Sequence, residues 1–556
     1  MIMEKIRAQL LRYSLIWLVV IPAIFAVIFI NPLREMALED DWAYSLTVRH
    51  LLETGNYQLN NWLAANMPFQ AYWGLLFSRV IGFSHSTLHI STLVLAFFGL
   101  IAFYYLAREH GLGPVQSSVL TLSLLAGPLF LKFSFTFNTD IPFLACLITA
   151  LLCYSRALRL LSTRWMIAGS LAASCAILTR QLGVALPIGL FVLWLFEPER
   201  RSRVGFFIAG IALPVVAAAW QVYAGSATPN WAAQYVKIEQ QAYILNSLAS
   251  PVPSIFANIW RLTAILHYLA LFALPLLLLA ITGFRPHLRQ NQERSTTGKV
   301  ARVARRAEII LVIWIGGSAL LTGFYGRFMP YFPWNFDVTP VHGLDIFVTI
   351  LTTIGAIELT HIVFQAAIQE GFRANKTESK FLLEIVTIFL LVFLMFFFQI
   401  GDQYLIVLMP FTLIVIGRKL QLRLTRWSTI ALLGAFMSVG VLWTRGQFSR
   451  VEAIWKASDT LAATGVESTN IYGDWIWNAY HGIFDEYIAN ADDQQRYSLK
   501  NFFYNWLPQK QAAAQYWVVT TLNPPNDENW EVVATIPFQG DFFQGQKAYV
   551  VKRSSR

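Results

Sequence analysis

The sequence predicts an all-α polytopic membrane protein of about 13 transmembrane helices with a small C-terminal extracytoplasmic α/β domain. Three observations support this fold class. The chain is 56% hydrophobic and only 13% charged, whereas charged residues make up about a quarter of a typical soluble domain. Apolar runs of roughly 17–25 residues, the length that crosses a bilayer, recur as far as Trp443. Beyond that residue the chain is polar and contains no further spanning run.

The predicted spans follow one another from the N-terminus. The first apolar run, 15–30, follows three basic residues like a signal peptide, but it has no clear small-residue cleavage site. We therefore expect it to be retained as a span. The thirteen predicted spans centre near Val20, Ala96, Leu122, Leu147, Ser170, Leu190, Ile211, Ala273, Ile313, Ile350, Ile388, Thr412 and Met437.

The loops between these spans differ in charge. With the N-terminus in the cytoplasm, one set of loops holds about 24 basic residues and the other about 8, as the positive-inside rule requires. The net charge of +10 is therefore explained by the orientation of the chain in the membrane and does not indicate nucleic-acid binding. The first loop (32–71), the loop before Asp140, a long loop at 221–261 and everything after Trp443 are predicted to lie outside the cytoplasm.

Two parts follow from this pattern: a membrane domain, 1–444, and an extracytoplasmic α/β domain, 445–556. The three cysteines lie in apolar segments without ligand spacing, so we expect neither disulfides nor a thiolate metal site. In the C-terminal domain the pattern predicts helices at 448–463 and 479–489, and strands at 470–475, 516–521, 531–536 and 547–552.

Acidic residues at the ends of spans are the first candidates for chemistry. Asp40 and Asp41 lie in "LEDDWAY", directly after the first span, and Asp140 opens the fourth span on the same side. Carboxylates near a membrane edge require water, a cation or a partner. As ordinary hydrated charges, Asp40 and Asp41 would have no catalytic role, whereas Asp140 could cap a helix and still bind a ligand. As a group, they could divide the roles of base and orienting acid, or Asp40 and Asp140 could share a divalent metal ion.

Cations are scarce on the outer side, so each one there is a candidate ligand for a phosphate at the membrane surface. The candidates are Lys132, Arg180 and Arg327, although an interfacial lysine is often only a membrane anchor. Another outer turn, "GDQYLIVLMPF", contributes Asp402 and Tyr404. His85 and His89 are spaced i, i+4, but no third ligand lies near them in the sequence, so we expect no histidine metal site there.

Several motifs resemble the bacterial family-39-like membrane glycosyltransferases of the GT-C fold, the class that includes protein O-mannosyltransferases and the aminoarabinose transferase. The first-loop pattern of that family is matched by Asp40, Asp41, Tyr44 and the pair Thr54-Gly55. The motif "FNTDIPF" matches its second acidic site at Asp140, and "LTRQLG" matches an outer turn at Arg180. A lysine usual in the first loop is replaced by Met67. The resemblance is strongest over 30–200.

This resemblance implies an enzyme that transfers a sugar from a polyprenyl-phosphate carrier to a lipid, glycan or protein acceptor at the outer face of a bacterial inner membrane, with inversion. Asp40 would be the general base, with Asp41 and Asp140 as orienting or metal-binding acids. Arg180 would be the leading phosphate contact, and Tyr44, Lys132, Arg327, Asp402 and Tyr404 would complete the substrate site. A divalent metal ion is the one cofactor that it leaves open.

Two other classes of function fit the composition. A lipid or glycan transporter would carry charges deep within its spans and broken or repeated helices, whereas the acids here cluster at span ends. A scaffold with a glycan- or protein-binding C-terminal module would use the aromatic run "YGDWIWNAYHGIF" for stacking, although such aromatics more often form a domain core.

Overall fold

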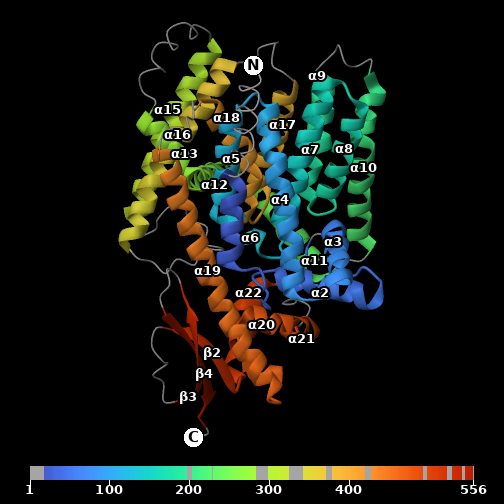
Figure 1. Cartoon of the computed structure of the whole chain (residues 1–556), viewed down its shortest axis with the longest axis vertical. Coiled ribbons are helices and arrows are strands. Elements are labelled where there is room, and N and C mark those ends of the chain that lie inside the picture. The colour runs from blue at the N-terminus through green and yellow to red at the C-terminus, as the bar shows by residue number, and fades with distance from the viewer. Residues whose placement is uncertain are drawn as a thin grey trace, which may run out of the picture.

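The computed structural model describes residues 18–64, 66–196, 203–227, 230–283, 299–324, 342–370, 378–419, 427–491, 497–521, 529–540 and 545–554. These residues form a bundle of long apolar helices, with the C-terminal sheet at one end (Figure 1). The helices of the bundle are 18–30, α4 (His85–Glu109), α5 (Pro114–Ala126), α6 (Pro128–Ser134), α7 (Asp140–Leu160), α8 (Thr163–Ile177), α9 (Ala185–Phe196), α10 (Val204–Ala227), α12 (Pro251–Phe272), α13 (Leu274–Gly283), α15 (Lys299–Phe324), α16 (His342–Glu370), α17 (Glu378–Phe396), α18 (Met409–Lys419) and α19 (Trp427–Ala463).

These helices confirm the predicted fold class of a polytopic membrane protein. Within the described residues, seven helices are long and apolar enough to span a membrane, or eight if one bent pair counts as a single span. Three shorter apolar helices accompany them. Twelve of the thirteen predicted span centres lie inside a helix, and Ala273 lies at the joint between α12 and α13.

One predicted span is broken. The helices α5 and α6 meet at a bend of 67°, where Gly127 is followed by Pro128. Proline has no backbone N–H to continue the helical ladder, so the chain turns there. The bend directs α6 toward the end of the bundle near the C-terminal domain (Figure 1). Lys132 belongs to this helix.

The long loop predicted at 221–261 is instead helical. The helix α10 continues to Ala227, α11 occupies Trp231–Ala249 and α12 begins at Pro251. Polar residues along α11 obscured its helical character in the sequence. Asn230 caps α11 by accepting a hydrogen bond from the backbone of Ala233, and its side-chain amide donates to two carbonyls of the first loop.

The first loop contains helix α2 (Asp41–Thr54) and leads into α3 (Pro68–Ile81). Together with α11, these helices lie at the end of the bundle that faces the C-terminal domain (Figure 1). The predicted outer loops therefore converge on one end of the molecule.

The C-terminal domain is a four-stranded sheet with several short helices. Its strands are β1 (Ile471–Tyr472), β2 (Tyr516–Thr521), β3 (Trp530–Gln539) and β4 (Gly545–Arg553). They lie in the order β1-β2-β4-β3, with β1 parallel to β2 and the other pairs antiparallel. The predicted strand at 516–521 matches β2. The strand predicted at 470–475 is wrong beyond Tyr472, because Asp474 caps a helix that begins at Trp475. The helical elements of the domain are α20 (Trp475–Tyr480), α21 (Ile483–Asn490), α22 (Leu499–Asn501), the π-helical turn Phe502–Trp506 and α23 (Leu507–Ala513).

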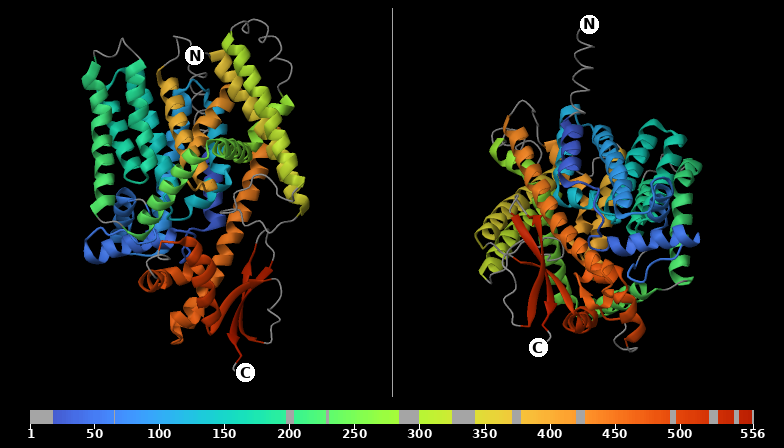
Figure 2. Two further views of the ribbon diagram at one scale, coloured as in Figure 1. Left: turned by 180° about the vertical axis from the view of Figure 1, so that it is seen from behind. Right: turned by 60° about the horizontal axis from the view of Figure 1, so that its bottom comes forward.

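Helix α19 joins the two parts of the molecule without a break. It runs for 37 residues from the bundle to the sheet, as Figure 2 shows from behind. Its last turns bury Ala453, Ile454 and Ala457 against Val518 and Val550 of the sheet. The expected boundary between residues 444 and 445 therefore lies inside a helix.

Candidate active site

Asp40 lies at the N-terminus of α2, where the backbone makes a sharp turn. The preceding residue, Glu39, has a φ of 56°, a left-handed conformation that is uncommon for residues other than glycine. The indole Nε1 of Trp62 donates a hydrogen bond to Asp40 Oδ1 over 2.7 Å. Asp40 is half-buried. Burial raises the pKa of its carboxyl group, and the hydrogen bond from Trp62 and the charge of Arg180 lower it only in part.

Asp140 and Arg180 form a buried ion pair. Arg180 Nη2 lies 3.0 Å from Asp140 Oδ2, and Arg180 Nε donates to Thr139 Oγ1 over 2.6 Å. The two oxygens come from adjacent residues at the start of α7. They hold the guanidinium in one orientation, while Oδ1 of Asp140 is buried without a hydrogen-bond partner among the described residues. The sequence predicted that these residues lie on one side, and the structure brings them into contact.

Gly183 explains part of the turn that carries Arg180. A short 3₁₀ turn, Gln181–Val184, follows the arginine. A Cβ atom added at Gly183 would lie 2.6 Å from the backbone nitrogen of Ile177. Because a backbone atom cannot move aside as a flexible side chain can, only glycine lets the turn pack this closely against the end of α8.

Two tyrosines complete the surroundings of this ion pair. The Tyr44 hydroxyl lies 3.5 Å from Thr139 Oγ1, and the guanidinium of Arg180 lies 5.1 Å from the ring centre of Tyr404. Burial and the nearby Asp40 carboxylate raise the pKa of Tyr44. Tyr44 and Tyr404, both predicted substrate contacts, therefore lie beside Arg180.

Asp402 is close to the ion pair of Asp140 and Arg180. Its side chain is buried at the start of the 3₁₀ helix Asp402–Leu408, and its Oδ1 accepts a hydrogen bond from the backbone of Gln403. The charge of Asp402 contributes to raising the pKa of Glu39. The structure thus gives Asp402 a role in the local charge balance.

Lys132 reaches the site from α6. Its ammonium group forms an ion pair with Glu39, next to Asp40. Burial raises the pKa of Glu39 to about 7, and the charge of Lys132 lowers it only in part. Lys132 is buried, so it is not an exposed membrane anchor.

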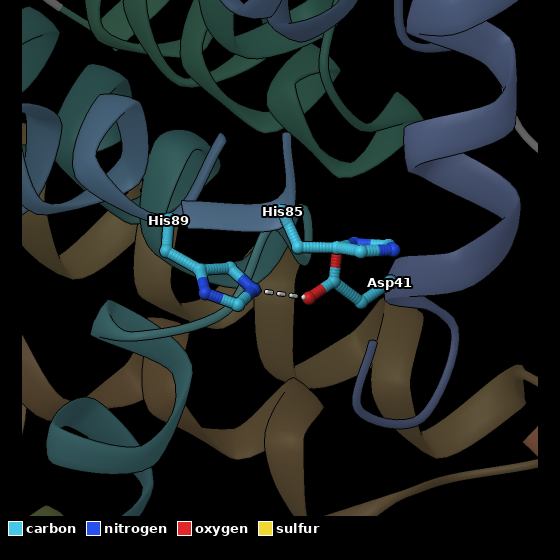
Figure 3. Close-up of side chains that lie close together, drawn as sticks. All are labelled: Asp41, His85 and His89. Atoms are coloured by element: carbon cyan, nitrogen blue, oxygen red, sulfur yellow. Dashed lines mark hydrogen bonds and ion pairs between the residues drawn. The ribbon is translucent and has the colours of Figure 1, made fainter. Parts of the chain in front are cut away.

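The remaining predicted residues lie elsewhere. Arg327 lies outside the described residues. Met67 is fully buried. Asp41 points toward α4, where its Oδ2 lies 2.9 Å from His89 Nε2 (Figure 3). The expectation that His85 and His89 have no third ligand nearby is wrong, because Asp41, 44 residues earlier than His85, lies beside both of them.

The C-terminal domain covers the Asp40 region, a feature that sequence reasoning missed. The ring of Trp62 contacts Trp475, Phe484, Phe502 and Phe503 at centroid distances of 4.7–6.2 Å. Trp477 of the aromatic run is fully buried. These aromatics form a packed core between the domain and the first loop, and they leave the stacking-platform interpretation of this run without support.

A polar contact reinforces this cover. Arg34 Nη1 lies 2.6 Å from Glu452 Oε2 and donates to Ser449, both on α19. Arg34 and Trp62 thus attach the first loop to the C-terminal part at two points, one before and one after Asp40.

The arrangement combines a half-buried carboxylate with two cations, Arg180 and Lys132, in a water-poor setting at one end of the bundle. Such a carboxylate can accept a proton from a hydroxyl group. Guanidinium and ammonium groups bind phosphate oxygens and stabilise negative charge that develops on a leaving group.

Comparisons with known proteins give one sequence match and several distant structural likenesses. No curated protein sequence matches the chain. Solved structures that resemble it include ArnT from Cupriavidus metallidurans bound to undecaprenyl phosphate, at 13% identity over 97% of this chain and 98% of that chain, with a TM-score of 0.44. The Pmt1-Pmt2 complex of S. cerevisiae bound to the sugar donor is 13% identical over 38% of this chain and 33% of that chain, with a TM-score of 0.32. AglB from Archaeoglobus fulgidus, an archaeal oligosaccharyltransferase, is 11% identical over 85% of this chain and 59% of that chain, with a TM-score of 0.40.

With TM-scores below 0.5, these structural likenesses add nothing to the argument about activity. The sequence match is more specific, and it includes Lys132, Asp140 and Arg180. Over residues 66–220, the chain matches the model of the dolichyl-phosphate-mannose-protein mannosyltransferase family, which confirms the family resemblance for this segment.

Proposed function

We propose that the protein is an integral membrane glycosyltransferase that moves a sugar from a polyprenyl-phosphate carrier to an acceptor hydroxyl outside the cytoplasm. The observation that carries this proposal is the position of Asp40, half-buried beside a guanidinium that Asp140 and Thr139 hold in place. The family match over 66–220, which includes Arg180, supports the same reaction class.

In the proposed reaction, Asp40 accepts the proton of the acceptor hydroxyl as its oxygen bonds to the anomeric carbon of the donor sugar. The bond from this carbon to the phosphate oxygen breaks on the opposite face, so the configuration inverts. The polyprenyl phosphate leaves with the electron pair. Arg180 stabilises the charge that develops on it, and Lys132, which is paired with Glu39 next to Asp40, adds further positive charge.

The position of Asp140 is relevant to whether the site binds a metal ion. A divalent ion shared by Asp40 and Asp140 is one form of the proposal. The ion pair between Asp140 and Arg180 favours the other form, in which the guanidinium supplies the positive charge without a metal. The metal content of Asp140→Asn, compared with that of the wild type, separates the two forms, because only the first form loses a bound ion with this substitution.

The proposal includes location and domain roles. The protein lies in a bacterial inner membrane with its N-terminus in the cytoplasm. The active site and residues 445–556 lie on the opposite side, in agreement with the asymmetry of basic residues between the loops. The proposed domains are 1–444 and 445–556. The domain 445–556 covers the loop that carries Asp40, and its contact with Trp62 orients the Asp40 side chain.

The first experiment compares the wild-type protein with Asp40→Asn in lipid nanodiscs, with a panel of polyprenyl-phosphate-linked hexoses and pentoses as donors. We expect Asp40→Asn to lose at least about 100-fold in turnover, the usual contribution of a general base. It should retain donor binding, as measured by native mass spectrometry. Asp485→Asn, at an exposed position, is the matched control.

A transporter gives a different result. If the wild-type protein moves a labelled carrier lipid between the leaflets of proteoliposomes without transferring its sugar, and Asp40→Asn does not change that rate, the chain is a flippase and the transferase proposal is wrong.

A further inference from the structure

Three buried side chains meet where α2 and α4 begin. Asp41 is the first residue of α2, and His85 and His89 lie on the first two turns of α4. Their potential ligand atoms all lie within 4.8 Å of one another. Figure 3 shows the Asp41 carboxylate between the two imidazoles. The three side chains are 0%, 6% and 1% exposed, respectively.

Hydrogen bonds satisfy this cluster only in part. Nε2 of His89 and Oδ2 of Asp41 pair with each other. Asp41 Oδ1, His89 Nδ1 and both ring nitrogens of His85 are buried without a hydrogen-bond partner among the described residues. A buried polar atom without a hydrogen-bond partner destabilises the folded protein. A simple Asp41–His89 hydrogen bond accounts for one contact. It does not explain why both ring nitrogens of His85 are buried beside it without a partner among the described residues.

We propose that Asp41, His85 and His89 bind a divalent metal ion, and that Zn²⁺ is the ion that the site fits. Two imidazoles and one carboxylate are a typical zinc ligand set, with ligand atoms about 2.0–2.2 Å from the metal. An ion among the three ligand atoms would replace the Asp41–His89 hydrogen bond and give His85 a partner. A fourth position would remain for water or another ligand.

The surroundings support a cation. The carboxylate of Glu35 accepts hydrogen bonds from the backbone nitrogens of His85 and Ser86, at 3.0 and 3.2 Å, and holds the start of α4. A surface pocket of about 400 Å³ reaches His85, so an ion has a route from solvent; Glu35 lines it together with the ion pair of Arg49 and Glu53. The ring of His85 packs against Trp455 and Tyr480, which limits its rotation.

The site would connect two elements. It would attach the first residue of α2, directly after Asp40, to α4, in the way that structural zinc sites hold separate segments together. The inference does not rest on the proposed transferase reaction, because metal content and stability are measured without a donor sugar.

The test uses the full chain, freed of any histidine tag and purified in nanodiscs without chelators. Metal content is measured by inductively coupled plasma mass spectrometry for the wild type, His85→Ala and His89→Ala. The control is His267→Asn, which changes a buried histidine that is hydrogen-bonded to Thr263 and Thr353 far along the chain. Addition of Co²⁺ to chelator-treated wild type reports coordination through its visible absorption.

We expect about one Zn²⁺ per wild-type chain and per His267→Asn chain, and its loss from both triad variants. Chelation should lower the melting temperature of the wild type, and Zn²⁺ should restore it. The inference is wrong if the wild type contains no zinc and takes up neither Zn²⁺ nor Co²⁺, or if His85→Ala keeps the wild-type metal content. Because the wild-type titration decides by itself, a variant that fails to fold does not obscure the result.

Discussion

Trp62 and Asp40 are joined by a hydrogen bond of 2.7 Å from the indole Nε1 to the carboxylate Oδ1. The two residues belong to opposite ends of one loop. The same indole ring packs edge-on against Phe484 of the C-terminal domain, at a centroid distance of 4.7 Å. The orientation of Asp40 therefore depends on residues more than 400 positions later in the chain.

Trp62→Phe should lower kcat roughly 10- to 100-fold with little change in the KM for donor, because a hydrogen bond to a charged group is worth about 1.5–3 kcal/mol. Phenylalanine keeps most of the aromatic packing. The measurement is steady-state kinetics. The matched control is Trp73→Phe, which removes an indole hydrogen bond to the Ser91 carbonyl. A Trp62→Phe enzyme with wild-type kcat would mean that this bond does not orient the base.

Arg180→Lys should reduce kcat/KM for the donor at least tenfold, because lysine cannot bind Thr139 and Asp140 at once with a planar fork or stack on Tyr404. Initial rates at several donor concentrations measure this. Arg79→Lys, an exposed arginine on α3, should change nothing. If Arg180→Lys and Arg79→Lys behave alike, the guanidinium geometry is irrelevant to donor binding.

Gly183→Ala should lower both the melting temperature and the activity, because the new methyl group would meet the Ile177 backbone at 2.6 Å and displace the turn that carries Arg180. Gly205→Ala is the control, since a Cβ there meets nothing within 4 Å and alanine favours the helix. Thermal unfolding and turnover are measured on both. Equal melting temperatures for the two variants would contradict the packing argument.

Asp474 gives a prediction about pH. Burial raises the pKa of its carboxyl group to about 6, against hydrogen bonds from the backbone of Trp477 and Ile476 that lower it. Between about pH 4 and 6 the folded state therefore holds this proton more strongly than the unfolded state, so the free energy of unfolding decreases as the pH rises through that window. Asp474→Asn removes this dependence and keeps the helix cap, because Asn and Asp are similar caps.

The measurement is the melting temperature of wild type and Asp474→Asn from pH 4 to pH 7. We expect the variant to gain stability relative to wild type as the pH rises. The exposed Asp485→Asn should show no such trend. A difference between Asp474→Asn and wild type that stays constant with pH would contradict a raised pKa at Asp474.

The sequence was sufficient for the positions of most spans and for strand β2, because a bilayer imposes a minimum length on apolar runs and strand pairing favours β-branched and aromatic residues. It also placed Asp140 and Arg180 on one side, since both lie at span ends. It could not show that they touch, or that Thr139 shares the guanidinium, because such contacts depend on how α7 and α8 pack.

Other features leave no local signal in the sequence. The contact of Asp41 with His89 joins residues 48 positions apart, and the left-handed backbone of Glu39 occurs at a residue type that rarely adopts it. The bend at Pro128 could have been predicted from the Gly-Pro pair, but its 67° angle depends on packing around α6.

The 37 residues of α19 correspond to a rod of about 55 Å at 1.5 Å per residue. The hydrocarbon core of a bilayer is only about 30 Å thick, so the rod has more than 20 Å left beyond it. It therefore sets the height at which the sheet stands above the lipid surface. Because Ser449 and Glu452 on this rod bind Arg34, lengthening its last turns would move the sheet away from the lipid and shift the contacts that hold the first loop.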